Sequence, residues 1–266
     1  MDIQILGHSD IDLLKDLQPT GWQDIIPIFD FYTNSVFCFP IKATIDNKIV
    51  GIGTTIIHND IAWLAHIIVR PDNRNNGIGQ LITQTLIDSL KAKNCDTIYL
   101  IATDLGAPVY EKLGFETETE YLCFKDIQTD MGWTISKNIT LFTDDFKEHI
   151  ANIDRHVSGE DRMLQIQQHL TYGYVYLQDK IIEGYYLPTL GEGLIIANTS
   201  SAGLELMKLR LTTKENIAFP IDNLSATEFL HKNNYKEFKM VKRMRLGTKR
   251  TWLPAKIYSR IGGHLG

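Results

Sequence analysis

The sequence is poor in cysteine, in long apolar runs and in surplus charge of either sign. Its 266 residues include only Cys38, Cys95 and Cys123, a scattered, odd-numbered set that predicts neither a disulfide framework nor a metal site. The longest apolar runs, such as residues 61–69, reach about half the ~20 residues that a membrane helix needs. A net charge of −5 excludes nucleic-acid binding driven by overall charge. The N-terminal residues lack a signal-peptide pattern, so we expect a reducing, cytoplasmic location and neither membrane nor nucleic-acid partners.

The composition is otherwise that of an ordinary globular protein. Hydrophobic residues make up 44% and charged residues 22%, which excludes a disordered or collagen-like chain. At roughly 100–200 residues per domain, the length fits one large domain or two small ones. Basic residues concentrate near the end, because residues 242–260 hold seven of them and no acidic residue. This stretch predicts either a solvated strand edge with a tail or a contact with an anion.

The first half of the chain alternates the periodicities of helices and strands. Residues 61–69 are almost wholly apolar, as in a strand buried on both faces, and residues 82, 86 and 90 form an apolar helical stripe. The predicted helices are 11–17, 24–31, 81–93 and 107–113. The predicted strands are 36–45, 48–58, 61–69, 97–102 and 121–127, the first two joined as a hairpin by Asp46-Asn47.

The second half repeats this order of elements. The predicted helices are 144–156, 160–170, 202–211 and 226–233, and the predicted strands are 174–178, 180–187, 193–197, 216–220 and 237–246. A weak internal sequence repeat accompanies this order of elements, since residues 111–115 align with 231–235. Residues 128–138 have little periodicity. We therefore predict domains at 1–130 and 138–250, followed by a basic C-terminal tail at 251–266.

The sharpest local feature is VRPDNRNNGIG, residues 69–79, between a predicted buried strand and an amphipathic helix. Gly77 and Gly79 allow the backbone to approach a ligand closely. The helix that follows directs free N–H groups and the positive end of its dipole at that ligand, which suits phosphate. Arg74 adds a cation for a diphosphate.

Three classes of phosphate-binding loop compete for this stretch. A P-loop needs G-x-x-x-x-G-K-[ST], which is absent, and a dinucleotide loop needs a third glycine where Ile82 stands. The third class is the pyrophosphate loop [RQ]-x-x-G-x-[GA], and residues 74–79 match it at every fixed position. The stretch thus resembles the GNAT superfamily of acyl-CoA-dependent N-acyltransferases.

A second motif, and short segments spread over the whole chain, strengthen this resemblance. Residues 110–115, YEKLGF, resemble the superfamily's Y-x-[KR]-x-G-F signature at the usual distance. Gly21-Trp22, residues 68–71, Asp161-Arg162 and residues 257–263 resemble a group with a second, degenerate GNAT-like domain. The resemblance implies an α/β (α+β) protein with two tandem GNAT-like domains, each a mixed, mostly antiparallel central sheet flanked by helices.

The resemblance also implies acetyl-CoA as co-substrate, without a metal. The implied cofactor-binding residues are Ile67, Ile68, Val69, Arg74, Asn75, Asn76, Gly77, Ile78, Gly79, Gln80, Thr103 and Tyr110. The Val69 N–H would stabilise the oxyanion of the attacked thioester. Tyr110 would protonate the departing thiolate, since a phenol of pKa ~10 can donate to a thiolate whose acid has a pKa of ~8.5. Thr103 replaces the asparagine that many relatives place there.

The sequence departs from the family pattern at the catalytic base. Many relatives carry glutamate four residues before the position of Val69, where this chain has Ala65. His66 is next, and strand alternation points its side chain to the opposite face. A neutral imidazole could accept the proton of the amine, although a lone histidine in an apolar strand also fits a core role. A carboxylate of Asp24 or Asp30, a water relay or a group from the second domain are further candidates.

The acceptor site and the second domain carry weaker signals. Aromatic residues crowd positions 22–40, where one or two could shape an acceptor pocket beside the acetyl end of the CoA channel. In the second domain, residues 198–203 hold neither an arginine nor a G-x-G, and Leu230 stands in the place of Tyr110. We therefore expect a non-catalytic second domain and one CoA site per chain.

The function predicted from these features is direct transfer of an acetyl group, in a ternary complex, from acetyl-CoA to a primary amine of a small molecule. His66, Val69 and Tyr110 are the candidate catalytic residues. Two alternatives stay open. One is an acyl-CoA-binding sensor or scaffold without turnover, suggested by the missing glutamate. The other is an acetyltransferase of protein N-termini or lysines.

Overall fold

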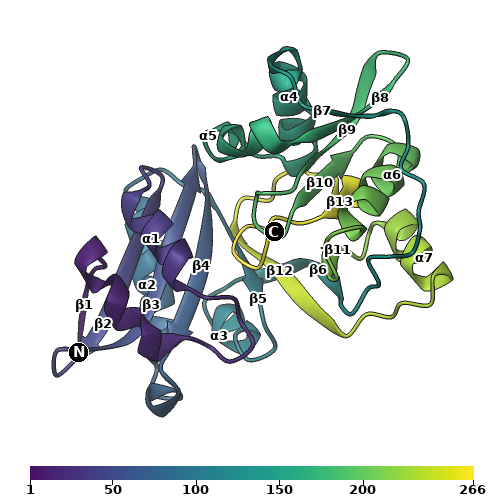
Figure 1. Ribbon diagram of the computed structural model, residues 1–266. Helices are drawn as coiled ribbons and strands as arrows, with labels where there is room; N and C mark the ends of the chain where they lie inside the picture. Colours follow the sequence, from purple (N-terminus) through teal and green to yellow (C-terminus); the bar gives the residue numbers. More distant parts are fainter. The chain divides into compact units, whose positions relative to one another are not determined.

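The computed structural model describes all residues, 1–266, and forms two compact units (Figure 1). Unit 1 comprises Met1–Glu116 and Met244–Lys249, and unit 2 comprises Thr117–Arg243 and Arg250–Gly266. None of the helices is both long and apolar enough to span a membrane.

Unit 1 is a largely antiparallel sheet with helices on both faces (Figure 1). Its strands, in spatial order, are β1 (Asp2–Ile5), β2 (Cys38–Ile45), β3 (Lys48–His58), β4 (Ile61–Val69), β5 (Thr97–Ala102) and the end of β12 (Lys239–Gly247). The 3₁₀ helices are η1 (His8–Leu17) and η2 (Pro71–Asn73), and the α-helices are α1 (Ile26–Asn34), α2 (Ile78–Lys91) and α3 (Ala107–Lys112). Only β4 and β5 pair in parallel among the first five strands.

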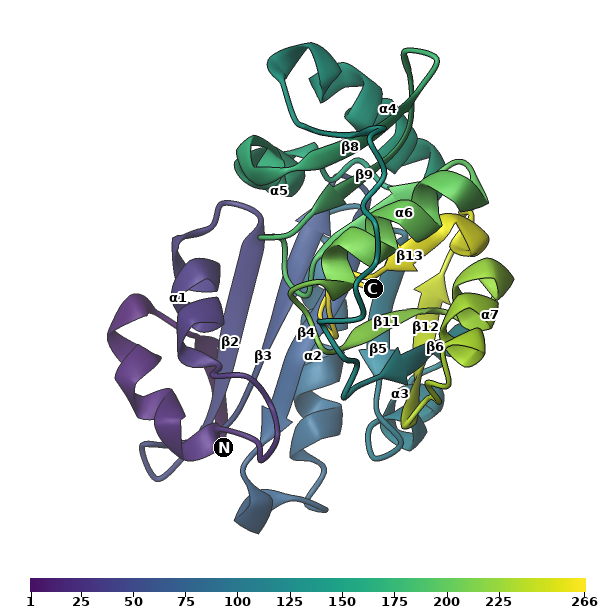
Figure 2. The ribbon, with the colours of Figure 1, turned by 45° about the vertical axis from the view of Figure 1, so that its right-hand side comes forward.

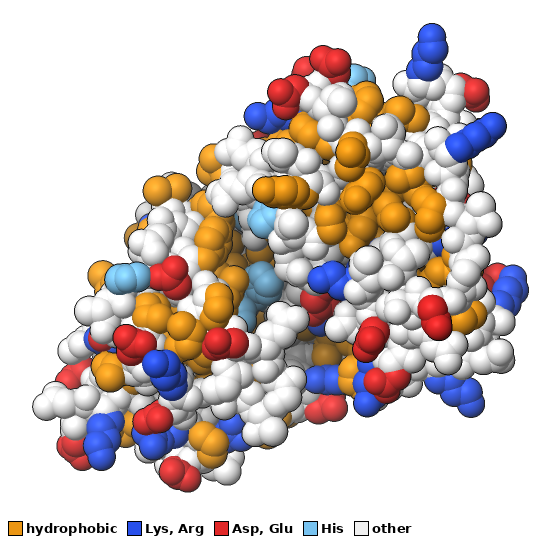
Figure 3. All heavy atoms as spheres, viewed as in Figure 1, with side chains coloured by type: hydrophobic (Ala, Val, Ile, Leu, Met, Phe, Trp, Pro, Cys, Tyr) orange, Lys and Arg blue, Asp and Glu red, His pale blue; other side chains and the backbone are white.

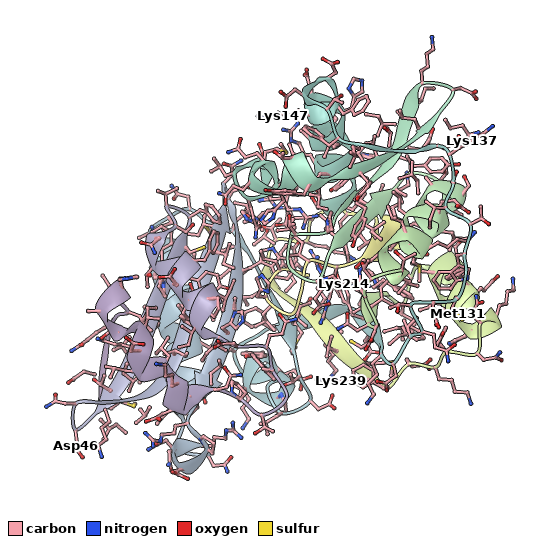
Figure 4. The ribbon with its side chains drawn as sticks, in the orientation of Figure 1. Asp46, Met131, Lys137, Lys147, Lys214 and Lys239 are labelled. Atoms are coloured by element: carbon pink, nitrogen blue, oxygen red, sulfur yellow. The ribbon has the colours of Figure 1, made fainter.

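The predicted hairpin of unit 1 is confirmed. Asp46 and Asn47 join β2 to β3 with φ of 48° and 61°, and two successive left-handed residues match the twist of a tight hairpin. Asp46 is labelled at the tip of this hairpin in Figure 4.

The predicted apolar stripe of α2 is confirmed as well. Ile82, Leu86 and Leu90 are at most 1% exposed, and they pack on β3 and β4. Burial of each such side chain contributes about 1.5–3 kcal/mol. The helix begins at Ile78, earlier than predicted, because Gly77 caps it in the left-handed conformation, with φ of 75°.

Unit 2 contains a five-stranded sheet and a smaller strand group with helices packed on them. The five strands, in spatial order, are β13 (Ile257–Ser259), β10 (Leu194–Ala197), β9 (Ile181–Leu187), β8 (Tyr174–Gln178) and β7 (Ile139–Leu141). The smaller group is β6 (Glu116–Phe124), β11 (Ile217–Pro220) and the first part of β12. The helices are η3 (Asp144–Phe146), α4 (Lys147–Ser158), α5 (Met163–Ile166), η4 (Gln167–Tyr172), α6 (Ser200–Leu211), α7 (Leu224–Lys232) and η5 (Pro254–Lys256).

A buried ion pair fixes the helical side of unit 2. Arg162 donates two hydrogen bonds from Nε and one from Nη2 to the carboxylate of Asp154, and both side chains are at most 3% exposed. The Tyr185 hydroxyl donates to the same carboxylate. Removal of one partner of such a pair strands a buried charge and costs about 3–5 kcal/mol. The predicted helix at 160–170 accordingly starts only after Arg162, as α5.

Each unit takes its closing strand from the other half of the chain. In unit 1, Thr248 follows β12 and lies beside the start of β5, where its N–H donates to Asp96 O and its carbonyl accepts from Thr97 Oγ1, both at 2.9 Å. In unit 2, β6 pairs antiparallel with β11 in the register Phe124↔Ile217. Sequence periodicity alone assigns strand 121–127 to the first domain and strand 237–246 to the second.

The domain boundaries therefore differ from those predicted. The compact units divide between Glu116 and Thr117, not at 128–138, and residues 244–249 belong to unit 1 rather than to the second domain. Sequence periodicity identifies a strand but not the neighbour with which it pairs, because the backbone hydrogen bonds that select a partner carry no side-chain signature.

The prediction of a basic tail at 251–266 is wrong. Ile257, Tyr258 and Ser259 are between 1% and 3% exposed and form β13, which pairs with β10. Three arginines of the basic stretch are paired with carboxylates. These pairs are Arg243–Glu118, Arg245–Glu116 and Arg260–Glu192.

The exchange of closing strands predicts that the first half alone folds poorly. A fragment of residues 1–116 lacks the strand that covers the edge of β5, so we expect it to aggregate or to unfold without cooperativity. The same fragment with residues 239–249 appended through a Gly-Ser linker should regain a cooperative transition. Circular dichroism melting and gel filtration of both fragments measure this, and equal stability of the two would contradict the role of the exchanged strand.

Candidate active site

A bulge in β4 organises the candidate site. Thr54 pairs with Ala65 and Ile52 with Ile68, so Gly53 of β3 faces both His66 and Ile67. His66 has φ of 49°, a conformation that is uncommon for residues other than glycine. A bulge of this kind adds one residue to the strand and re-aims its side chains.

The predicted orientation of His66 is wrong, because the bulge shifts the alternation of side chains along β4. Leu64 and Ile67 both pack in the core that α2 covers, so the two residues between them face the other side of the sheet. Simple alternation would have put His66 on the α2 side. The extra residue instead leaves His66 on the same face as Ala65, the position at which many relatives carry the glutamate.

The ring of His66 lies among three aromatic side chains, Trp22, Phe29 and Tyr32, which we call the aromatic nest. Its centroid is 6.0 Å from that of Trp22, 5.8 Å from that of Phe29 and 5.6 Å from that of Tyr32, each in an edge-on arrangement. The Tyr32 hydroxyl and His66 Nδ1 are 3.0 Å apart, within hydrogen-bond distance. Burial raises the pKa of Tyr32 well above its ordinary value, so this hydroxyl stays protonated.

The aromatic nest is open to solvent at one side. Trp22 is 45% exposed, whereas Phe29 and Tyr32 are buried. Figure 3 shows hydrophobic side chains gathered beside α1 on this side of unit 1. A ligand with an apolar body therefore has a surface to contact next to His66.

Beyond the start of β4, its edge on the β5 side has no strand beside it. The parallel pairing of β4 with β5 covers three residue pairs and ends at Trp63↔Tyr99. On the β3 side, the Arg70 N–H donates to Val50 O at 2.8 Å. Since hydrogen-bonded and non-hydrogen-bonded pairs alternate in an antiparallel ladder, the Val69 N–H and C=O point away from β3, toward the open edge. The Val69 carbonyl accepts a hydrogen bond from Arg74 Nε at 3.1 Å, as this direction requires.

The predicted phosphate loop directly follows this edge. Arg74, Asn75, Asn76 and Gly77 are exposed, and Asn75 and Gly77 have φ of 63° and 75°. A Cβ on Gly77 would meet no atom within 4 Å, so glycine is favoured there by its backbone conformation and not by crowding. Through the bond from Arg74 to Val69, the loop folds back on the end of β4.

The first turn of α2 presents unused donors at the loop. Leu81 N–H bonds to Gly77 O, whereas no side chain caps the helix and Ile78, Gly79 and Gln80 N–H have no acceptor in the chain. A Cβ on Gly79 would lie 3.7 Å from the Val69 side chain, an ordinary contact. The packing of the fold therefore does not require glycine at position 79, and the three free N–H groups beside it suit an anion such as a diphosphate.

Tyr110 lies on α3, at the edge of the same core as Ile67 and Val69. Its ring contacts Gly106, where a Cβ would come within 2.9 Å of it, and its centroid is 6.0 Å from that of Phe115. Its hydroxyl has no hydrogen-bond partner in the chain. Burial raises the pKa of Tyr110 to about 12, so the phenol is protonated at neutral pH and is able to donate.

Three of the other predicted residues have structural partners. Thr103 Oγ1 accepts the Gly106 N–H at 3.3 Å and helps to start α3. Asp24 accepts the Ile26 N–H at 2.9 Å at the start of α1, and Asp30 lies 3.1 Å from His8 at the surface. Asp24 is thus bonded to the first residue of α1 and Asp30 is part of a surface pair, which leaves His66 as the titratable candidate on the bulge.

The sequence pattern revealed neither the role of Tyr32 nor the bulge itself. Tyr32 was one of several aromatic residues in the segment, with nothing to distinguish it from core. The pair Gly51 and Gly53 in β3 was the available signal, because glycine inside a strand often marks a bulge or a close approach. A Cβ at Gly53 would lie 2.9 Å from Ile82, so Gly53 lies both opposite the bulge and at a close approach of α2.

The comparisons with known proteins agree with this geometry. The model of the acetyltransferase (GNAT) family matches residues 9–115, which include β4, the loop, α2 and Tyr110. No curated protein matches the chain in sequence.

Solved structures match the chain over nearly its whole length. A Pyrococcus horikoshii protein described as an acetyltransferase is 19% identical, with a TM-score of 0.85 over 100% of this chain and 95% of its own. A tandem GNAT protein from the clavulanic acid biosynthesis pathway is 10% identical, with a TM-score of 0.63 over 94% of this chain and 99% of its own. The glucosamine N-acetyltransferase region of a fungal GH3 β-N-acetylglucosaminidase is 11% identical, with a TM-score of 0.67 over 92% of this chain and 38% of that one.

At these identities the structural matches establish the fold, and the family model adds the class of chemistry, acyl transfer from an acyl-CoA. Residues 9–115 thus match the acetyltransferase (GNAT) family model, and over its full length the chain has the fold of a tandem GNAT protein.

Proposed function

We propose that the protein transfers an acetyl group from acetyl-CoA to a primary amine of a small molecule, within one ternary complex. The observation that carries the proposal is the open edge of β4. This edge has the Val69 N–H at one end, next to the donors of α2, and His66 on the bulge, on the side of the aromatic nest. An acyl-CoA bound along this edge would meet N–H groups that can bind its diphosphate at one end, and the imidazole of His66 as a proton acceptor at the other.

The roles of the residues follow from where each donor and acceptor points. The N–H groups of Ile78, Gly79 and Gln80 hold the diphosphate, with Arg74 as a nearby cation. The Val69 N–H donates to the thioester oxygen as negative charge develops on it, which is the stabilisation that acyl transfer needs most. Tyr110 donates its phenolic proton to the sulfur as the C–S bond breaks.

His66 removes the proton that the attacking amine must lose. For its Nε2 to accept, Nδ1 must carry the hydrogen and donate it to the Tyr32 oxygen, 3.0 Å away. Burial keeps the Tyr32 phenol neutral, and its oxygen can accept this N–H, so the bond holds the imidazole in one orientation. Tyr32 is therefore a positioning residue and His66 the base.

The surroundings of His66 support a small acceptor with an apolar body. The rings that line it are aromatic, and Trp22 is half exposed at their rim. The aromatic nest favours an amine carried on a flat or hydrophobic group. A screen of primary amines, read by the release of free CoA thiol, tests this class against lysine-containing peptides.

The diphosphate role of α2 predicts that Gly79→Glu abolishes acetyl-CoA binding in calorimetry while circular dichroism stays native. A Cβ at position 79 makes only an ordinary contact with the Val69 side chain, so we expect the fold to persist, whereas the carboxylate repels phosphate. Ser89→Glu, at an exposed position of the same helix, is the control and should bind normally. Retained affinity in Gly79→Glu would remove the loop from the cofactor site.

The base role predicts that His66→Gln lowers kcat by about 10²–10⁴-fold with little change in the KM for acetyl-CoA. The loss should shrink for weakly basic amines, which arrive without the extra proton. Tyr32→Phe should give a smaller loss with the same dependence on amine basicity, and His8→Gln, at a surface histidine, should behave as the parent. An equal loss for every amine would indicate a packing role for His66.

The acid role predicts that Tyr110→Phe also loses about 10²–10⁴-fold in kcat and retains acetyl-CoA affinity. The loss should diminish for thioesters of more acidic thiols. Because the pKa of Tyr110 is about 12, the ratio of parent to variant rates should stay constant from pH 7 to pH 10. A ratio that falls toward one within this range would mean that the hydroxyl deprotonates there, contrary to its burial.

A further inference from the structure

Unit 2 contains a counterpart of the parted strand pair of unit 1, and we call the space between such parted strands the slot. The order β10, α6, β11, α7 in unit 2 repeats the order β4, α2, β5, α3 in unit 1. In unit 1, β4 and β5 pair briefly and then part. In unit 2, β10 and β11 belong to different strand groups and do not pair with each other at all.

The C-terminal segment of the chain fills this counterpart. β13 pairs antiparallel with β10 in the register Ile195↔Ser259, along the edge that faces away from β9 (Figure 1). On the other side, the Arg260 N–H donates to Ala218 O of β11 at 2.9 Å. Peptide groups of the segment thus bond to both strands, in the position in which unit 1 leaves the edge of β4 unpaired.

The same segment also occupies the start of α6, which corresponds to the phosphate end in unit 1. A Cβ on Gly203, in the first turn of α6, would lie 2.2 Å from the Tyr258 ring, so glycine is required there. The side chains of Ser200, Ser225 and Asn223 face the Tyr258 hydroxyl. Figure 2 shows the yellow segment passing beside α6.

Further contacts hold the segment along its length. Asn223 Nδ2 donates to Ile257 O at 2.9 Å, and Lys256 Nζ donates to Asn198 Oδ1 at 3.3 Å, in the loop between β10 and α6. Arg260 donates to both oxygens of Glu192, at 3.0 and 2.8 Å. The anchors run from the beginning of α6 to the far end of the slot.

We propose that residues 256–260 act as a built-in, permanent substitute for an acyl-CoA in unit 2. The amides of β13 replace the amides of the pantetheine arm against β10, and Tyr258 replaces the phosphates at the start of α6. Unit 2 thereby contains a peptide-binding slot between β10 and β11. The ligand of this slot is the C-terminal segment of the same chain, so unit 2 folds without a cofactor. This slot is independent of the acyl transfer proposed for unit 1.

A nick in the full-length protein tests the proposal. A protease recognition sequence inserted between Lys249, which is exposed, and Arg250, which is partly exposed, lets the C-terminal peptide be cut from the folded chain. We expect residues 250–266 to stay bound through gel filtration. A labelled synthetic peptide of the same sequence should exchange into the slot, and a Tyr258→Ala version of the peptide should bind at least tenfold more weakly. A Thr251→Ala peptide, altered at an exposed side chain outside the slot, is the matched control and should exchange as the parent peptide does.

Acetyl-CoA in the millimolar range should bind the nicked protein at one equivalent per chain and displace no peptide. Displacement of the peptide, or a second equivalent of acetyl-CoA, would overturn the proposal, because the segment would then be a removable lid. Spontaneous loss of the peptide with unchanged amide protection of β10 and α6 would also overturn it. If the insertion itself prevents folding, hydrogen exchange on the uncut chain replaces the nick. The Arg260 amide should then exchange only with global unfolding, and faster exchange would contradict the proposal.

Discussion

The hydrogen bonding between β4 and β5 stops at Trp63↔Tyr99, and the chemistry proposed for this protein depends on that parting. Up to this point, the two strands satisfy each other's backbone groups. Beyond it, the Val69 N–H faces an edge without a neighbouring strand. An unpaired edge is a template for any extended chain with amides of its own. In the proposed function, the loop at residues 74–77 and α2 make the edge selective for a ligand whose extended arm leads to a diphosphate.

The β4 bulge gives this edge its second property. One extra residue opposite Gly53 turns His66 toward the aromatic nest and returns Ile67 to the core. The left-handed conformation of His66 is unfavourable for a residue with a side chain, and the packing of Ile67 against α2 and the bond to Tyr32 hold it in place. A chain without glutamate at position 65 thereby still presents a titratable side chain on that face.

The two units satisfy the backbone groups of a parted strand pair in opposite ways. A buried backbone donor or acceptor without a partner costs about 1–3 kcal/mol, so a parted pair of strands needs water, a ligand or more chain between them. In unit 1 no strand fills the gap beyond Trp63↔Tyr99, whereas unit 2 fills its gap with β13. The filled slot explains physically why unit 2 needs neither a phosphate loop nor a tyrosine at position 230.

The sequence by itself determined the elements whose signals are local, namely β2 to β4, α2, the hairpin between β2 and β3, and the glycine-containing loop before α2. These depend on backbone conformation and burial within about ten residues, which the side-chain pattern records directly. Only the tertiary structure decided which strands are neighbours, as in the exchange of β6 and β12 and the insertion of β13 beside β10. Such pairing depends on backbone N–H and C=O groups that nearly every residue has, so the identities of the residues do not reveal it. The direction of His66 was likewise decided by one bulged residue, because a shift of one residue in a strand reverses every later side chain.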